Sequence, residues 1–102
     1  MPKQRFDGVI EAVRYSPQGQ IAFVRAYERR GAAFSDCILL DRAALIERLK
    51  ARKRFVTGQR LEFLAGTFDP AHEVLLLSRN GKEIISTKPD AERDYLEGAL
   101  AI

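Results

Sequence analysis

The chain has 102 residues, of which 46% are hydrophobic and 30% are charged. This length fits one domain with one buried core, and the composition argues against a disordered chain. The net charge of +3 favours an anionic partner without requiring one. No apolar run approaches the roughly 20 residues that span a bilayer, and the N-terminus lacks the apolar segment of a secretory signal, so we expect a cytoplasmic protein.

The sequence offers few residues for chemistry. Cys37 is the only cysteine and His72 the only histidine, so one chain can build neither an internal disulfide nor a Cys/His zinc cluster. A Cys–His nucleophilic pair is formally open, but Cys37 lies in an apolar run that predicts a buried strand. Glycine-rich phosphate loops, nucleophile elbows and paired carboxylates are absent from the sequence. We therefore expect no enzyme activity, no catalytic residue, no metal and no cofactor.

The first part of the chain predicts a meander of three strands. Residues 9–15 form the first strand, and residues 16–19 carry a turn signal. The second strand, which runs to Arg30, therefore pairs with the first in antiparallel orientation. Residues 34–40 form a third, mostly buried strand.

The second strand has two different faces when it is read at a two-residue period. Small aliphatic side chains suit the inside of a curved sheet, so we expect Ala22, Val24 and Ala26 in the core. The opposite face carries aromatic rings, which can stack on unpaired bases, and arginines, which attract phosphates. Its members are Ile21, Phe23, Arg25, Tyr27 and Arg29. In the alternative interpretation these rings pack under a neighbouring element and the arginines are merely solvated.

Asp41 precedes the clearest helix, predicted over residues 42–53. Asp41 can cap the free amides of the first turn, and Leu45, Ile46 and Leu49 form one apolar stripe. The cations that end this helix either match the negative end of its dipole or extend a basic surface. Basic residues dominate residues 42–60, whereas acidic residues dominate residues 90–97.

The rest of the chain predicts a fourth strand over residues 61–65, a loop over residues 66–71 with a turn at Asp69-Pro70, and a fifth strand over residues 73–78. Asn80-Gly81 is a strong hairpin signal and returns the chain as a short strand over residues 83–87. Pro89-Asp90 can start a helix over residues 91–100. We thus expect a barrel in residues 1–88 and an acidic extension in residues 89–102, with a C-terminal hairpin or a short helix.

This order of elements, with one helix between the third and fourth strands, is that of the OB-fold, a five-stranded antiparallel barrel. Residues 7–64 also resemble the cold-shock domain. Gly8-Val9-Ile10-Glu11 looks like the opening of that family, and Gly19 with Ile21-Ala22-Phe23-Val24 is similar to its RNA-binding strand. Asp36-Cys37-Ile38-Leu39-Leu40 is similar to its second RNA-binding motif, and Gly58-Gln59-Arg60-Leu61-Glu62-Phe63 to its fourth strand.

The sequence also departs from the cold-shock pattern. Ile21, Ile38 and Leu40 stand where that family has stacking side chains or a histidine, and the predicted helix is longer than the equivalent segment. Leu75-Leu76-Leu77-Ser78-Arg79 looks more like the end of the ribosomal S-one type RNA-binding domain, another OB-fold.

The resemblance implies a non-enzymatic module that binds single-stranded RNA or DNA through the second and third strands. We expect stacking by aromatic rings and phosphate contacts by arginines, with two further aromatic residues in or beside the flanking loops. The candidates for stacking are Phe23 and Tyr27, and those for phosphate contacts are Arg14, Arg25, Arg29 and Arg30. The two aromatic residues near the loops are Tyr15 and Phe68.

The alternative is a protein-interaction or oligomerisation domain, including a homodimer. It is favoured by the aliphatic residues Ile21, Ile38 and Leu40, and by the acidic C-terminal segment, which would cover the basic face or dock elsewhere. Neither hypothesis involves a membrane.

Overall fold

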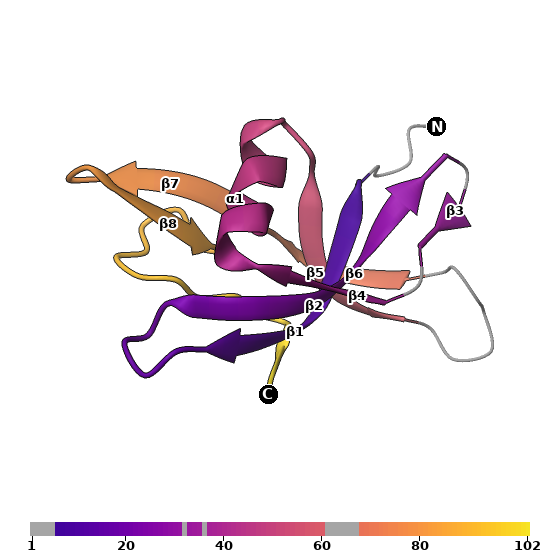
Figure 1. Ribbon diagram of the computed structural model, residues 1–102, viewed down its shortest axis with the longest axis horizontal. Coiled ribbons are helices and arrows are strands. Elements are labelled where there is room, and N and C mark those ends of the chain that lie inside the picture. The colour runs from indigo at the N-terminus through magenta and orange to yellow at the C-terminus, as the bar shows by residue number, and fades with distance from the viewer. Residues whose placement is uncertain (1–5, 32, 36, 61–67) are drawn as a thin grey trace.

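The computed structural model describes residues 6–31, 33–35, 37–60 and 68–102, which form mainly β structure with one helix (Figure 1). In chain order the elements are β1 (Gly8–Tyr15), β2 (Ile21–Arg30), β3 (Ala33–Phe34), β4 (Ile38–Asp41), α1 (Arg42–Lys50), β5 (Phe55–Arg60), β6 (Phe68–Glu73), β7 (Leu75–Arg79), β8 (Lys82–Ser86) and β9 (Leu100–Ala101). None of the described helical residues forms a segment long and apolar enough to cross a membrane.

β1 and β2 form the predicted antiparallel hairpin. The turn between them places Gly19 at a φ of 85°, and its amide donates to the Ser16 carbonyl oxygen at 2.9 Å. Glycine adopts this left-handed conformation without steric cost, which is why the sequence signal was reliable here. The expected third strand is divided into β3 and β4, and both parts pair with β2.

Two irregularities in the β1–β2 register change which side chains enter the core. The pairing shifts at Glu11 and again at Ala22, each of which is the extra residue of a bulge. Because the second bulge interrupts the alternation, Ile21 turns into the core and Ala22 is exposed, the reverse of the expected faces. Val24 and Ala26 are fully buried, as predicted.

α1 begins as expected but is shorter. The Asp41 carboxylate accepts a hydrogen bond from the Ala44 amide at 2.8 Å, so Asp41 is the N-cap. The helix ends at Lys50 rather than at residue 53, because Arg52 takes a φ of 65°, which a helix cannot contain. Leu45 is fully buried, and Ile46 and Leu49 pack against the core.

The large sheet is mixed, whereas the sequence predicted an antiparallel barrel. β5 pairs with β1 in parallel, and the described strands follow the order β3-β2-β1-β5-β6 without closing into a barrel. The reason lies at the start of both strands, where the amides of Asp7 and Gly8 donate to the Arg54 carbonyl oxygen. Since α1 returns the chain to the beginning of β1, β5 runs alongside it in the same direction.

The strand predicted over residues 61–65 lies outside the described residues. Strand pairing instead starts earlier, at Phe55, and the predicted turn at Asp69-Pro70 is wrong because both residues belong to β6, opposite Gln59 and Gly58. β7 and β8 form a separate two-stranded sheet. Their turn has φ values of 52° at Asn80 and 78° at Gly81, so the predicted Asn-Gly hairpin is confirmed.

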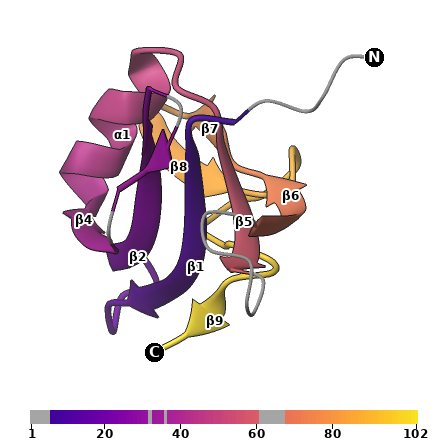
Figure 2. The same ribbon diagram turned by 90° about the vertical axis from the view of Figure 1, so that its right-hand side faces the viewer.

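The C-terminal segment is extended, and the predicted helix over residues 91–100 is absent. Tyr95 forms an isolated bridge with Ser86, Gly98 has a φ of 93°, and β9 pairs with β1 at Ala12 and Val13. Figure 2 shows β9 beside the end of β1. An extended backbone lets this segment hydrogen-bond to β1 and β8, which a short helix interrupted by glycine cannot do.

The core lies between the sheet, α1 and the β7–β8 hairpin, and its members come from all three. Asp94 fastens these parts together at the edge of the core. Its carboxylate accepts hydrogen bonds from the amide of Ile21 on β2 at 2.9 Å, the amide of Ile85 on β8 at 3.0 Å, and Nε of Arg42 on α1 at 2.8 Å. A second link joins β5 to the C-terminal segment, because the Thr57 hydroxyl donates to the Glu97 carbonyl oxygen at 2.7 Å.

Candidate nucleic-acid interface

Some of the predicted site residues lie on the face of β1, β2 and β4 that is turned away from α1, which we call the outer face. Val24 and Ala26 occupy the opposite, inner face with Leu45 of α1, so Phe23, Arg25 and Tyr27 alternate onto the outer face. Pairing fixes their neighbours. Arg14 lies opposite Phe23, and Leu39 lies opposite Arg25.

Part of the outer face is open to solvent. Arg14 and Arg25 are exposed, Phe23 is half-buried and Leu39 is 65% exposed. Arg14 donates from one guanidinium nitrogen to the Ile102 carbonyl oxygen at 2.9 Å, so the C-terminal segment borders this area. No acid among the described residues forms an ion pair with Arg14 or Arg25.

Tyr27 is on the outer face but is covered, which corrects its expected role as a stacking platform. It is only 9% exposed and lies opposite the fully buried Val9. Its hydroxyl donates to Oε1 of Glu11 at 3.4 Å, and the bulge at Glu11 places that carboxylate beside it. A ring that is covered in this way has no free face for a base.

Arg29 lies against a pair of neighbouring aromatic rings. Its guanidinium carbon lies 4.7 Å from the centre of the Phe34 ring and 5.9 Å from that of Phe6. Nε of Arg29 donates to the Phe6 carbonyl oxygen at 2.9 Å, and the two rings are 5.8 Å apart. Arg29 was predicted as a site residue, but its contacts with Phe6 and Phe34 were not predicted. Phe34 lies opposite Arg29 in the β2–β3 pair, and only a prediction of β3 as a separate strand could have revealed this contact.

The remaining candidates are dispersed. Arg30 is exposed at the end of β2 and forms no ion pair with the described residues. Tyr15 packs against the core, and its hydroxyl accepts a hydrogen bond from the Leu96 amide at 2.9 Å. Burial raises the pKa of Tyr15, and these contacts give the side chain a role in packing instead of in the outer face. Phe68 starts β6, and its side chain lies outside the described part of the structure.

Cys37 differs from its expected environment, because it is exposed and precedes β4 instead of lying in a buried strand. Its thiol donates to Oε1 of Glu11 at 3.8 Å. Partial desolvation and the Glu11 carboxylate raise the pKa of this thiol, which disfavours the reactive thiolate. Among the described residues, no group of three His, Cys, Asp or Glu side chains is placed to hold a metal ion.

Comparisons with known proteins give no relative for this chain. No family model matches it, and no curated protein or solved structure is similar enough to count as a match.

Proposed function

We propose that the open part of the outer face binds single-stranded nucleic acid, RNA or DNA, without catalysing a reaction. The observation that carries this proposal is the group formed by Arg14, Phe23 and Arg25: a half-buried ring has one exposed arginine opposite it on β1 and another two residues along β2, and neither arginine forms an ion pair with a described acid. Bases stack on such rings, and arginines contact phosphates or stack with their planar groups.

The Arg29 cluster extends this group along β2. Arg29 follows Arg25 by four residues, or about 13 Å at the rise of a strand. Its guanidinium is already oriented by Phe34 and Phe6, which lowers the entropy that a phosphate contact would cost. Tyr27 lies between them on the same face but is covered, and it makes no contact with the ligand in this proposal.

An OB-like relationship belongs to the same proposal. The hairpin β1–β2, the strand β4, the helix and the return strand β5 follow the OB-fold order, and the OB-fold binds its ligands on the corresponding face. The parallel pairing of β1 with β5 departs from an antiparallel barrel, so the architecture supports the location of the site more than the identity of its ligand.

A protein partner is the second candidate, because apolar side chains border the same area. Leu39 and Leu100 are about two thirds exposed, at 65% and 66%, and Ile102 is 41% exposed. Leu39 lies on β4 and Leu100 on β9, at the two sides of the β1–β2 hairpin, and exposed apolar side chains of this kind can contact a protein partner. A second copy of the chain on this face would bury Phe23 and Leu39 together.

The test is a fluorescence binding series with single-stranded RNA, single-stranded DNA and duplex at two salt concentrations. We expect Phe23→Ala to weaken single-strand binding by about 1 to 3 kcal/mol, the range for one stacked base. Arg25→Ala should lower the slope of log affinity against log salt by about 0.7, the value for one phosphate of a single strand.

The matched control is Lys53→Ala, which removes an exposed cation from the segment after α1. It should leave affinity nearly unchanged. Single-strand binding that neither depends on salt nor weakens with Phe23→Ala would contradict the proposal. Light scattering on the same variants addresses the second candidate, since a dimer that dissociates with Leu39→Glu and binds no oligonucleotide would favour a protein interface.

A further inference from the structure

A groove lies between the turn that follows β1 and the turn of the β7–β8 hairpin. It consists of two adjoining surface pockets of about 370 and 450 Å³, which share Lys82, Ile84 and Glu92. Residues 18–20 form one wall of the larger pocket, and Arg79 and Asn80 line the smaller one. Ile84 is 5% exposed and gives the groove an apolar floor.

The charges in this groove are unevenly paired. The carboxylates of Glu83 and Asp94 are neutralised by Lys50 at 2.7 Å and Arg42 at 2.8 Å. Arg79, Lys82 and Arg93 form no ion pair with any described residue. Glu92 is the one lining acid in the described residues that has no such partner. Three cations against one free carboxylate make the groove suited to an anionic ligand.

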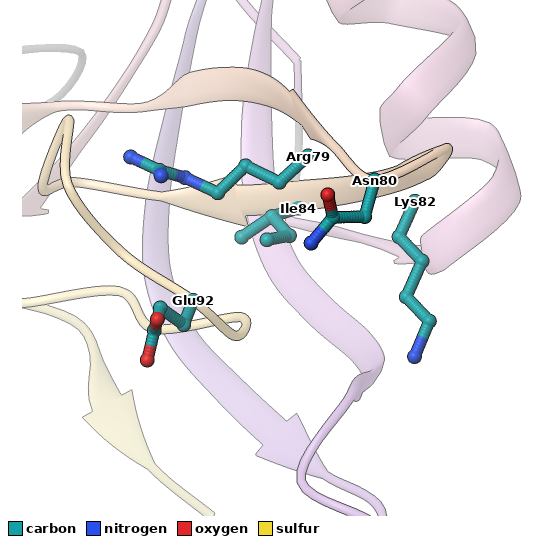
Figure 3. A pocket seen from close by; sticks show the side chains of 5 residues that line it. All are labelled: Arg79, Asn80, Lys82, Ile84 and Glu92. Carbon is teal, nitrogen blue, oxygen red and sulfur yellow. The ribbon is translucent and has the colours of Figure 1, made fainter.

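The arrangement of these side chains fits a nucleotide better than a bare anion. Figure 3 shows Arg79 and Lys82 extending from the hairpin on either side of Asn80 and Ile84, while Glu92 lies across the pocket on another segment. Cations can hold a phosphate, the apolar floor can carry a base, and a carboxylate can accept a hydrogen bond from an exocyclic amino group such as N4 of cytosine.

The groove opens on the side of the β1–β2 hairpin that carries Arg42 and Asp94, and it reaches the turn between the two strands. Residues 18–20 of this turn line it, and the last of them precedes Phe23 by three residues, or about 10 Å at the rise of a strand. A single strand that passes around this turn from the outer face would therefore enter the groove. We propose that this groove binds the continuation of the same single strand, with Lys82 and Arg93 contacting phosphates and Glu92 accepting from the base. This inference rests on the proposed function of the outer face.

Oligonucleotides of two lengths test it on the full chain. A 4-mer reaches the outer face alone, whereas a 12-mer can occupy both regions. The double variant Lys82→Ala, Arg93→Ala should bind the 12-mer about tenfold more weakly at low salt, with a salt slope lower by about 1.4 for two lost phosphate contacts, and should bind the 4-mer like the wild type. Phe23→Ala should weaken both lengths.

Two controls separate the possible failures. Lys53→Ala should leave both lengths unaffected, and thermal melting should show that every variant is folded. If the double variant binds the 12-mer like the wild type while Phe23→Ala still weakens it, the groove proposal is overturned and the outer-face proposal stands. If neither length binds the wild type, both proposals are overturned.

The role of the Glu92 carboxylate can be measured separately as a base preference. The ratio of affinities for a 12-mer of deoxycytidine and one of thymidine reports base contacts, because thymine presents an acceptor where cytosine has its amino group. Glu92→Ala should lower this ratio severalfold. An unchanged ratio would remove Glu92 from the proposed contact.

Discussion

The inner and outer faces of the β1–β2 hairpin use charged side chains for different purposes. On the inner side, Asp94 is 6% exposed and binds the backbone of two strands and the side chain of Arg42, while Glu28 binds Nε of Arg48 at 2.7 Å. On the outer side, Arg25 is exposed and forms no ion pair with a described residue. The inner charges therefore support the fold, whereas the charge of Arg25 on the outer face is not used in this way.

The largest effect should follow from removal of the inner carboxylate. Asp94→Ala leaves the half-buried Arg42 guanidinium without its counter-ion and two amides without an acceptor, and should lower the free energy of unfolding by about 3 to 5 kcal/mol. Urea denaturation measures this value. Asp90→Ala, which removes an exposed acid from the same segment, is the control and should leave the stability unchanged. Equal losses of stability from Asp94→Ala and Asp90→Ala would contradict the structural role of the inner carboxylate.

Asp94 should also make the stability depend on pH. Burial pushes its pKa upward, but the hydrogen bonds from Arg42, Ile21 and Ile85 outweigh burial, so the pKa lies below its ordinary value. Such a group stabilises the fold above the pKa of the unfolded chain, about 3.9, and this contribution is lost as the pH falls through the lower folded-state pKa. The advantage of the wild type over Asp94→Ala in urea midpoint should therefore shrink below pH about 4. A constant difference would contradict the assignment.

Gly8 tests how tightly the inner sheet is packed. A Cβ atom at Gly8 would overlap the ring of Phe55, which is fully buried, so Gly8→Ala should destabilise the protein by about 1 to 3 kcal/mol through overpacking. Phe55→Leu removes the clashing ring atoms. The double variant should thus lose less stability than the sum of the two single variants, and simple additivity in denaturation would exclude a direct clash.

The smallest effect on folding is expected on the outer face. Arg25→Ala should change the free energy of unfolding by less than about 0.5 kcal/mol, because no described partner is lost. The same variant is expected to weaken oligonucleotide binding, so its thermal melting curve and its binding curve together sharpen the contrast between the faces. A large loss of stability would show that Arg25 supports the fold.

Local signals in the sequence predicted well those elements that depend on neighbouring residues. Asp41 as an N-cap, Gly19 in the first turn and Asn80-Gly81 in the hairpin each act within a few residues, so the structure confirms them. The periodicity of β2 placed Val24 and Ala26 correctly in the core. Each of these features is determined by backbone conformation or by alternation along a single strand.

Features that depend on distant partners were missed. The bulges at Glu11 and Ala22 require knowledge of the pairing between two strands, and so does the burial of Tyr27 opposite Val9. The parallel pairing of β5 depends on where α1 returns the chain. The C-terminal segment had weak helix signals, but Asp94 and Leu96 gain their stability from contacts with remote strands, which no local pattern reveals. The Phe6–Arg29–Phe34 cluster of the candidate site was missed for the same reason.

Pro70 affects whether a strand of another molecule can pair with the edge of the sheet. β6 is the outermost described strand of its sheet on the β5 side, and the free edge of a strand is a template on which further chains can add and aggregate. Proline lacks the amide hydrogen that such addition requires and is tolerated at a sheet edge for that reason. The residue that in sequence resembled a turn thus interrupts this edge and makes the addition of another strand there less favourable.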